Sequence, residues 1–502
     1  MTGGAKKLER WEAGSVAALL LLALVLRVVG LNASLWYDEV STLIHFIRLP
    51  WGELVTDFSS LNNHMFYSLQ AKASVELFGE SASALRLPAL IMGMASLVLI
   101  WWLARKEVGR APALVTLLLL TLSYHHVWFT QNARGYTGLL TWTTAATILL
   151  MAGLRRPTWR GWTGYGLCLA AGMYTHLSAG FFFVAHGVVF AVLAALALLQ
   201  RQGKLARNYP GASSIRSYYG FALGGLLTLL VHLPMLEQIQ SSVGKVSSGS
   251  SVSAMAEWNN PLRTLQEFAG SLDALGPLAP YALIGGLLVL ILGAVLVTRR
   301  SPLLAAIYLT QIPLSLALLV ALSFRIWPRY FFVDIGFIFL CASMGALAIV
   351  RWAEGMVRRT PLRALAPAAL PAAIALMVGA SSILLIRNYE HPKQDLEGAV
   401  RLVVKLRQPQ DAATSVGLAI EPVHGFFAPD WPVTRSTADL DRLLEGGRTV
   451  WLITAFESHT RTTQAAIMRE VDTRFDKIAI LQGTLGGGNV QVYRSRPTAP
   501  AK

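Results

Sequence analysis

Residues 16–40 read VAALLLLALVLRVVGLNASLWYDEV, an apolar run that is followed within a few residues by two adjacent carboxylates, Asp38 and Glu39. The run is close to the length that an α-helix needs to cross the roughly 30 Å hydrocarbon core of a bilayer. Carboxylates held beside a membrane are costly and usually functional. The stretch therefore predicts a membrane helix with an acidic pair near one of its ends.

The remainder of the chain has the composition of a polytopic membrane protein. Of its 502 residues, 54% are hydrophobic and 14% are charged, and the mean hydropathy is +0.50, whereas soluble domains carry roughly 25% charged residues. We predict about eleven membrane-spanning helices. They lie at roughly 16–31, 86–104, 111–128, 137–153, 162–177, 180–200, 218–236, 279–298, 302–323, 330–350 and 365–386.

The distribution of basic residues predicts the orientation of these helices. A net charge of +15 would also suit nucleic-acid binding, but about 19 Lys and Arg residues lie in alternate short loops and about 8 in the other loops. By the positive-inside rule this asymmetry places the amino terminus in the cytoplasm and the carboxy terminus outside. The assignment requires that residues 62–79 lie in the membrane interface rather than cross it.

Two external loops follow from this orientation, at about 32–85 and 237–278. The second loop contains a Ser/Gly-rich run, 245–253, with little apolar surface to bury. Such a composition predicts a mobile segment. We expect this segment to act as a lid that becomes ordered when a ligand binds.

Residues 1–386 are thus predicted to form a transmembrane domain and residues 387–502 an extracytoplasmic α/β domain. In the second domain, helix-like segments alternate with short strand-like runs, as in a small α/β layer. The helices are predicted at about 394–407, 437–446 and 460–472, and the strands at 415–420, 450–454, 477–481 and 490–493. The glycine-rich run 483–488 lies between two strands and predicts a hairpin turn rather than a phosphate loop. Acceptor recognition or partner docking is the expected role of this domain.

Polar residues from several distant parts of the chain fall on the predicted external side. Random scatter would divide such residues between the two membrane surfaces, so the clustering predicts one external site. These residues are Asp38, Glu39, His64, Arg134, Tyr136, His176, Arg325, Arg329 and Tyr330.

The motifs that carry these residues resemble the GT-C glycosyltransferases, in particular the branch of the protein O-mannosyltransferases and the lipid A aminoarabinose transferase. The resemblance covers roughly residues 15–350, and Met65 and Phe66 stand where the family has two prolines. The matching segments are Leu35-Trp36-Tyr37-Asp38-Glu39, Asn63-His64-Met65-Phe66-Tyr67, Arg86-Leu87-Pro88, Gln131-Asn132-Ala133-Arg134-Gly135-Tyr136, Tyr174-Thr175-His176 and Pro328-Arg329-Tyr330.

This resemblance implies a polytopic α-helical enzyme that moves a sugar, with inversion, from a polyprenyl-phosphate carrier to a hydroxyl group of a protein or glycolipid. Asp38 is then the expected catalytic base, and Glu39 orients its surroundings or helps to hold a cation. The donor phosphate is expected to meet Arg134, Tyr136, Arg329 and Tyr330, because a guanidinium can bind phosphate oxygens bidentately. His64 and His176 are candidates for acceptor or phosphate contacts, or for ligands of a divalent cation.

Other interpretations of the same residues remain open. Asp38 and Glu39 can cap a helix amino terminus, and arginines at helix ends, such as Arg27, Arg86 and Arg325, commonly extend to lipid headgroups. A lipid or sugar-lipid transporter or flippase is the alternative function, and a scaffold is a third. The predicted location is the inner membrane of a bacterium, while the sugar, the acceptor and the oligomeric state do not follow from the sequence.

Overall fold

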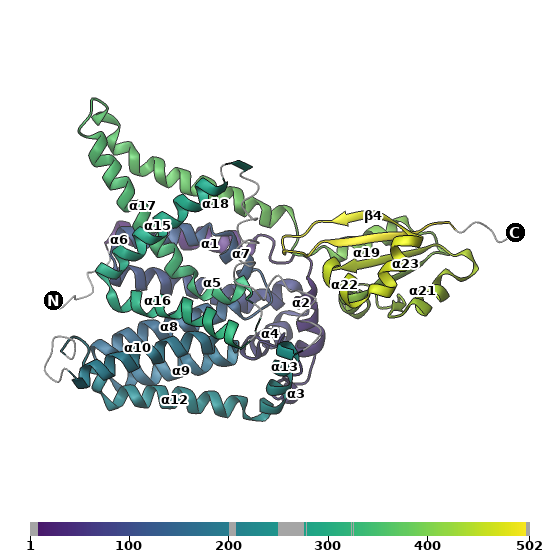
Figure 1. The fold of residues 1–502 in the computed structure, drawn as a ribbon, viewed down its shortest axis with the longest axis horizontal. Coiled ribbons are helices and arrows are strands. Elements are labelled where there is room, and N and C mark those ends of the chain that lie inside the picture. The colour runs from purple at the N-terminus through teal and green to yellow at the C-terminus, as the bar shows by residue number, and fades with distance from the viewer. Residues whose placement is uncertain are drawn as a thin grey trace.

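A computed structural model describes residues 9–199, 207–248, 276–277, 279–322, 324 and 326–497. The molecule consists of a bundle of long helices and a smaller part that contains a β-sheet, which lies beyond one end of the bundle (Figure 1). Residues 245–248 of the Ser/Gly-rich run form the end of helix α13 (Leu236–Ser248), and residues 249–253, the rest of the predicted lid, lie outside the described residues. Arg325 also lies outside the described residues.

The bundle confirms the predicted polytopic helical fold. Within the described residues, nine helical segments are long and apolar enough to cross a membrane, and the bent pair of α6 (Arg110–Thr121) and α7 (Tyr124–Thr130) makes a tenth. The nine segments contain α1 (Arg10–Val28), α5 (Ala82–Glu107), α8 (Tyr136–Arg155), α10 (Ala179–Leu199), α12 (Ile215–His232), α15 (Ala279–Arg300), α16 (Pro302–Ala321), α17 (Ile335–Val357) and α18 (Ala369–Glu390).

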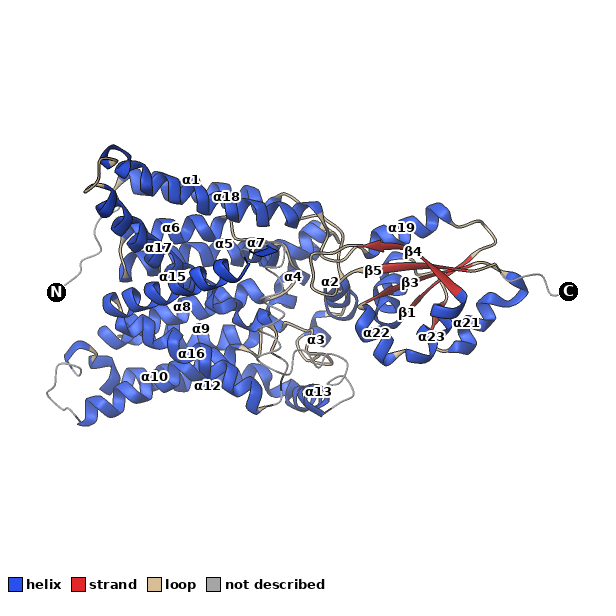
Figure 2. Cartoon of the chain, turned by 45° about the horizontal axis from the view of Figure 1, so that its top comes forward, coloured by secondary structure: helices blue, strands red, loops and turns tan. Residues whose placement is uncertain are grey.

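The remaining predicted span corresponds to α9 (Trp159–Thr175), which has 17 residues. At 1.5 Å per residue its length is roughly 26 Å, the lower limit for a transmembrane helix. It runs beside α8 and α12 in both views (Figure 1 and Figure 2). The difference between about eleven predicted spans and the ten found is therefore this one short helix.

A buried arginine explains the 60° bend between α6 and α7. The Arg27 guanidinium donates to the carbonyls of Leu120 and Thr121, at 3.0 and 3.2 Å, and contacts His126 Nδ1 at 2.9 Å. Carbonyls at the end of a helix lack hydrogen-bond donors within that helix. Arg27 supplies the donors for the carbonyls of Leu120 and Thr121. The prediction that Arg27 extends to the headgroups is wrong, because this side chain is fully buried.

Short helices cover the end of the bundle that faces the sheet (Figure 2). They are α2 (Tyr37–Thr42), a π-helical turn at Leu43–Ile47, α3 (Trp51–Leu54) and α4 (Met65–Phe78). With 14 residues, α4 is roughly 21 Å long and is too short to span, as predicted for residues 62–79. These elements bring the acidic pair to the boundary between the bundle and the sheet.

The carboxy-terminal part is a small α/β fold, as predicted. The sheet order is β2-β1-β3-β5-β4, with β1 parallel to β2 and β3, and β5 antiparallel to β3 and β4. The strands are β1 (Ala412–Val416), β2 (Val433–Thr434), β3 (Val450–Ala455), β4 (Phe475–Leu481) and β5 (Val490–Ser495), and the longer helices are α19 (Leu396–Leu406), α21 (Thr437–Leu444), α22 (Glu457–Thr463) and α23 (Ala465–Arg474).

Helices cover both faces of this sheet, so the central strand β3 is buried along its whole length. Trp451 and Ile453 pack with α19 on one face, and Val450 and Leu452 pack with α21 and α23 on the other, as the two-residue period of a strand requires. The predicted strand at 415–420 ends at Val416, because Gly417 has a φ of +65° and the chain continues as helical turns.

Candidate active site

The acidic turn and the loop 131–135, which precedes α8, are joined residue by residue. Trp36 Nε1 donates to Asn132 Oδ1 at 3.0 Å, and the Ala133 N–H donates to Glu39 Oε1 at 2.6 Å. Asp38 Oδ2 lies 3.7 Å from Arg134 Nη2. These contacts hold the two sequence motifs in one fixed geometry.

Glu39 is the buried centre of this connection and does not face the cavity. Its carboxylate accepts from Arg86 Nε at 2.7 Å and from Nη2 at 2.5 Å. Burial would raise the pKa of Glu39, but the charge and hydrogen bonds of Arg86, with Lys393 and the Ala133 N–H, hold it below its ordinary value. Glu39 is thus an ionised group that joins the turn to α5.

Arg86 corrects a second prediction. Its side chain is buried rather than extended to the headgroups. Besides binding Glu39, it donates to the carbonyls of Leu31, Ala33 and Ser34, at 2.9, 2.7 and 3.0 Å. The guanidinium therefore fixes both the chain that leaves α1 and the acidic turn that follows it.

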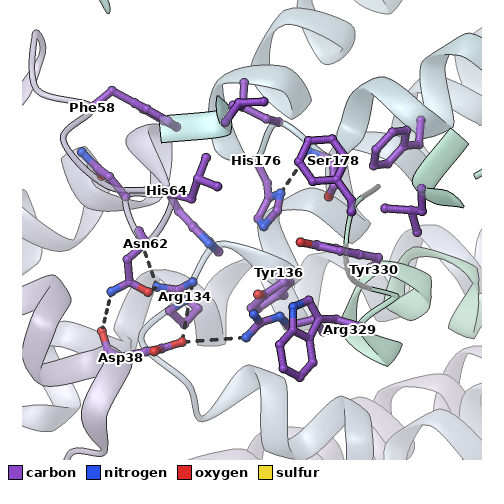
Figure 3. Close-up of a pocket in the computed structure, with 18 of the residues that line it drawn as sticks. Asp38, Phe58, Asn62, His64, Arg134, Tyr136, His176, Ser178, Arg329 and Tyr330 are labelled. Atoms are coloured by element: carbon purple, nitrogen blue, oxygen red, sulfur yellow. Dashed lines mark hydrogen bonds and ion pairs between the residues drawn. The ribbon is translucent and has the colours of Figure 1, made fainter. Parts of the chain in front are cut away.

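Of the predicted site residues that the structure describes, all except Glu39 line one cavity of about 460 Å³ (Figure 3). Asp38 lies at its edge between two guanidiniums, since its Oδ2 is 3.9 Å from Arg329 Nη1 as well as 3.7 Å from Arg134 Nη2. Arg134 is 5% exposed and Arg329 is 34% exposed. Arg329 is therefore the more accessible cation, and Arg134 is the more firmly held.

Asn62 is a site residue that the sequence analysis missed. Its Nδ2 donates to the carbonyl of Asp38 at 3.2 Å, and its own carbonyl accepts from Arg134 Nη1 at 2.8 Å. Its Oδ1 also accepts from Arg134 Nη1. Asn62 therefore bridges the acid and the arginine. The only signal in the sequence was its position next to the segment that begins at Asn63.

The two histidines lie together, with ring centroids 4.4 Å apart. His64 Nδ1 accepts from the Gly135 N–H at 2.8 Å, so the proton of the neutral ring is on Nε2. Burial lowers the pKa of His64 well below its usual value, and the charge of Arg134 adds to this effect. Within the described residues, Nε2 is buried without a hydrogen-bond partner. It is therefore a donor available to a ligand in the cavity.

This donor set does not fit a divalent cation. The described residues contain no group of three or more His, Cys, Asp or Glu side chains that could hold a metal ion. Glu39 is saturated by Arg86 and by the Ala133 N–H. His64 carries its proton on the nitrogen that remains free, whereas a metal needs an unprotonated nitrogen. We therefore assign no step to a metal.

A second cavity, of about 320 Å³, lies on the other side of α2, where the bundle meets the sheet-containing part. Its lining is largely polar and shares Asn62 with the first cavity. The lining residues are Tyr37, Ser41, His45, Phe46, Ser59, Ser60, Asn62 and Glu421. Asn62 thus borders both cavities.

Substitution of Gly135 by Ala should disturb this site. A Cβ at Gly135 would lie 2.9 Å from Thr175 Cγ2 and 3.0 Å from His64 Nδ1, so both side chains must move. We expect about a tenfold loss of activity, because small misplacements of site groups are costly. The control is Gly187→Ala in α10, where a Cβ meets nothing within 4 Å. Equal rates in both variants would contradict this prediction.

The chain resembles known proteins in one family model and in several solved structures. The family model described as dolichyl-phosphate-mannose-protein mannosyltransferase matches residues 65–234. The comparison with curated proteins gives no significant match. Among solved structures, ArnT from Cupriavidus metallidurans in the apo state has a TM-score of 0.52 at 14% identity, over 96% of this chain and 98% of that chain. The chain has the fold of the GT-C glycosyltransferases.

Two further structures share this fold. ArnT bound to undecaprenyl phosphate has a TM-score of 0.52 at 13% identity, with the same coverage of both chains. The archaeal oligosaccharyltransferase AglB from Archaeoglobus fulgidus, in complex with an inhibitory peptide and a dolichol-phosphate, has a TM-score of 0.53 at 12% identity. It covers 93% of this chain and 73% of that chain. With the family match, these findings confirm the predicted resemblance.

Proposed function

We propose that the chain is an inverting glycosyltransferase that takes a sugar from a polyprenyl-phosphate carrier and transfers it to a hydroxyl group of a protein or glycolipid. The observation that carries the proposal is the position of Asp38, whose Oδ2 lies within 4 Å of both Arg134 and Arg329 at the edge of the cavity. This arrangement puts an anionic base beside two cationic groups. The transfer of a sugar from a phosphate requires both.

The chemistry is a single displacement at the anomeric carbon. The acceptor oxygen bonds to that carbon while its proton passes to the Asp38 carboxylate. The bond from the anomeric carbon to the phosphate oxygen breaks on the opposite face, so the configuration inverts. The bonding electrons leave with the lipid phosphate. Arg329, Arg134 and the Nε2–H of His64 can take up the negative charge that develops there.

The apolar side of the cavity suits a prenyl chain. Residues from the loop before α4, the start of α10 and the end of α16 contribute carbon surface beside the two arginines. They are Phe58, Leu61, Leu177, Phe181, Leu319, Leu322 and Phe324. Burial of apolar surface away from water is favourable. These apolar residues therefore support a donor whose phosphate binds at the two arginines and whose prenyl tail extends toward the lipid.

The positive-inside pattern supports an orientation with this site outside the cytoplasm. We propose that the protein is in a bacterial inner membrane, with a cytoplasmic amino terminus and an extracytoplasmic sheet. Residues 1–386 would then form the catalytic membrane domain and residues 387–502 the external domain.

The test uses the purified chain in lipid nanodiscs with undecaprenyl-phosphate-mannose, undecaprenyl-phosphate-aminoarabinose and undecaprenyl-phosphate-galacturonate. Mass spectrometry measures the release of undecaprenyl phosphate, with membrane extracts as the source of acceptors. We expect release with at least one donor and a transferred sugar of inverted anomeric configuration. A flippase would move intact donor between the leaflets of proteoliposomes and release no carrier, and that outcome would disprove the proposal.

Arg329 should dominate the affinity for the carrier phosphate. Charge-assisted hydrogen bonds contribute about 1.5–3 kcal/mol, so we expect Arg329→Ala to weaken undecaprenyl phosphate binding roughly ten- to a hundredfold. Titration of the nanodisc-embedded protein with undecaprenyl phosphate measures this. Arg48→Ala is the control, because Arg48 pairs with Glu80 at an exposed position. Equal affinity of the two variants would place the phosphate elsewhere.

A further inference from the structure

The segment 391–395, between α18 and α19, contacts the loops that carry the site residues. Lys393 Nζ donates to the carbonyl of Gln131 at 2.6 Å and lies 5.4 Å from the centroid of the Trp128 ring. Gln131 follows the last residue of α7, so this carbonyl is one of those that a helix end leaves without a partner. Burial lowers the pKa of Lys393 to about 7, the Arg86 charge adds to this and Glu39 opposes it. The amine can donate the hydrogen bond to the Gln131 carbonyl whether it is charged or neutral.

The next residue contacts the acidic turn. Gln394 is fully buried, and its Oε1 accepts from the N–H of Tyr37 at 3.2 Å. Tyr37 is the first residue of α2, where backbone N–H groups also lack partners within the helix. Asp38 is the next residue along the chain. Lys393 therefore completes the end of α7, which precedes Arg134, and Gln394 completes the start of α2, which contains Asp38.

The glycine-rich turn between β4 and β5 holds this segment in place. The N–H groups of Thr484 and Leu485 donate to the carbonyls of Pro392 and Lys393, at 2.9 and 3.1 Å. Thr484 Oγ1 accepts from Trp128 Nε1 at 3.1 Å. In Figure 1 this end of the β-hairpin reaches the helical bundle. The turn thus contacts both the linking segment and α7.

The first glycine of the turn is required for this contact. A Cβ at Gly483 would lie 2.5 Å from the carbonyl oxygen of Lys393 and 3.3 Å from the Cα of Gln394. Two backbones therefore approach more closely than any residue other than glycine permits. Gly486, in the same turn, has nothing within 4 Å of an added Cβ, so the chain itself provides a matched control.

We propose that Pro392–Gln394 and the turn 483–488 form a clamp by which the carboxy-terminal domain positions the two loops of the active site, with Lys393 and Gln394 as positioning residues. The inference rests on the proposed function. With six and seven residues, α2 and α7 are too short to be stable alone, so contacts from outside must fix their ends. Asp38 and Arg134 then keep the separation that transfer needs.

The first test compares Gly483→Ala with Gly486→Ala. The probe is undecaprenyl-phosphate-mannose, or whichever of the three donors the wild type turns over. We expect Gly483→Ala to lower kcat about tenfold and Gly486→Ala to leave kcat within about twofold of the wild type. Because Arg329 is not held by the clamp, the affinity for undecaprenyl phosphate should stay within about threefold in both variants.

The second test replaces Gln394 with Leu, which keeps the side-chain volume and removes the acceptor for Tyr37. Gln408→Leu, at an exposed position in the same domain, is its control. The expected result is again a tenfold lower kcat for Gln394→Leu alone, with similar carrier affinity. The melting temperature and the monodisperse fraction of each variant show whether it folds. If Gly483→Ala fails to fold, the kcat of Gln394→Leu relative to that of Gln408→Leu tests the clamp.

Two results would overturn the clamp. One is wild-type kcat in both Gly483→Ala and Gln394→Leu, and the other is a kcat loss that equals the loss of folded protein. Asp38→Asn separates this inference from the proposed function. If Asp38→Asn transfers sugar at the wild-type rate, Asp38 is not the base, and if the wild type releases no carrier from any of the three donors, the proposed function fails. If Asp38→Asn is inactive while the clamp variants are fully active, only the clamp fails.

Discussion

Replacement of Asp38 by Asn should lower the rate of sugar transfer by about a thousandfold, within the range of roughly 10²–10⁴ that a general base contributes. Asn has the same shape but cannot accept the proton of the attacking hydroxyl group. The contacts that fix the turn involve the carbonyl of Asp38, which accepts from Thr42 Oγ1 at 2.7 Å and from Asn62 Nδ2 at 3.2 Å. The substitution leaves these contacts in place, so the variant should fold normally.

The affinity of Asp38→Asn for undecaprenyl phosphate tests the role of Asp38 independently of turnover. The Asp38 carboxylate partly neutralises Arg134 and Arg329, and Asn removes that negative charge. We therefore expect Asp38→Asn to bind undecaprenyl phosphate at least as tightly as the wild type does, while turnover falls. Asp57→Asn is the matched control. Asp57 lies in the loop between α3 and α4, and its Oδ1 accepts from the Ser59 N–H at 3.0 Å. Turnover by Asp38→Asn near the wild-type rate would eliminate Asp38 as the base.

The parts of this molecule that the sequence predicts are those with a local signal. Apolar runs of helical length locate the spans, because each helix must satisfy its own backbone in lipid. The run 162–177 lies at the limit of this rule, because α9 has 17 residues, about the smallest number that can cross a membrane. The hairpin around 483–488 was also predicted, because glycine between two strand-like runs is a local turn signal.

The buried contacts that assemble the site have no such signal. Arg86 resembles any arginine at a helix end, and only the fold reveals that Glu39 and three carbonyls surround it. Gln394 and Lys393 lie in a segment without periodicity, more than 250 residues from the loops that they contact. Candidate side chains could thus be identified from motifs. Their supporting contacts could not, because these depend on tertiary packing.

Replacement of Arg86 by Met should have the largest effect on stability. Arg86 and Glu39 are 1% and 0% exposed, and removal of one partner of a buried ion pair costs about 3–5 kcal/mol, because the remaining charge is uncompensated. The carbonyls of Leu31, Ala33 and Ser34 lose their donor at the same time. We expect a large fall in the thermal unfolding temperature in detergent and, because the acidic turn is released, a loss of activity.

The control is Arg48→Met, which removes an arginine from a pair with Glu80 whose partners are 45% and 40% exposed. Exposed pairs contribute only about 0–1 kcal/mol, so this variant should melt close to the wild type. Both are measured at pH 7. The pKa of Glu39 is below its ordinary value of 4.5, so the stabilisation from this pair is complete above that pH and is lost as Glu39 becomes protonated below it. If Arg86→Met and Arg48→Met melt alike at pH 7, the buried pair does not hold the acidic turn, and Glu39 must act in some other way.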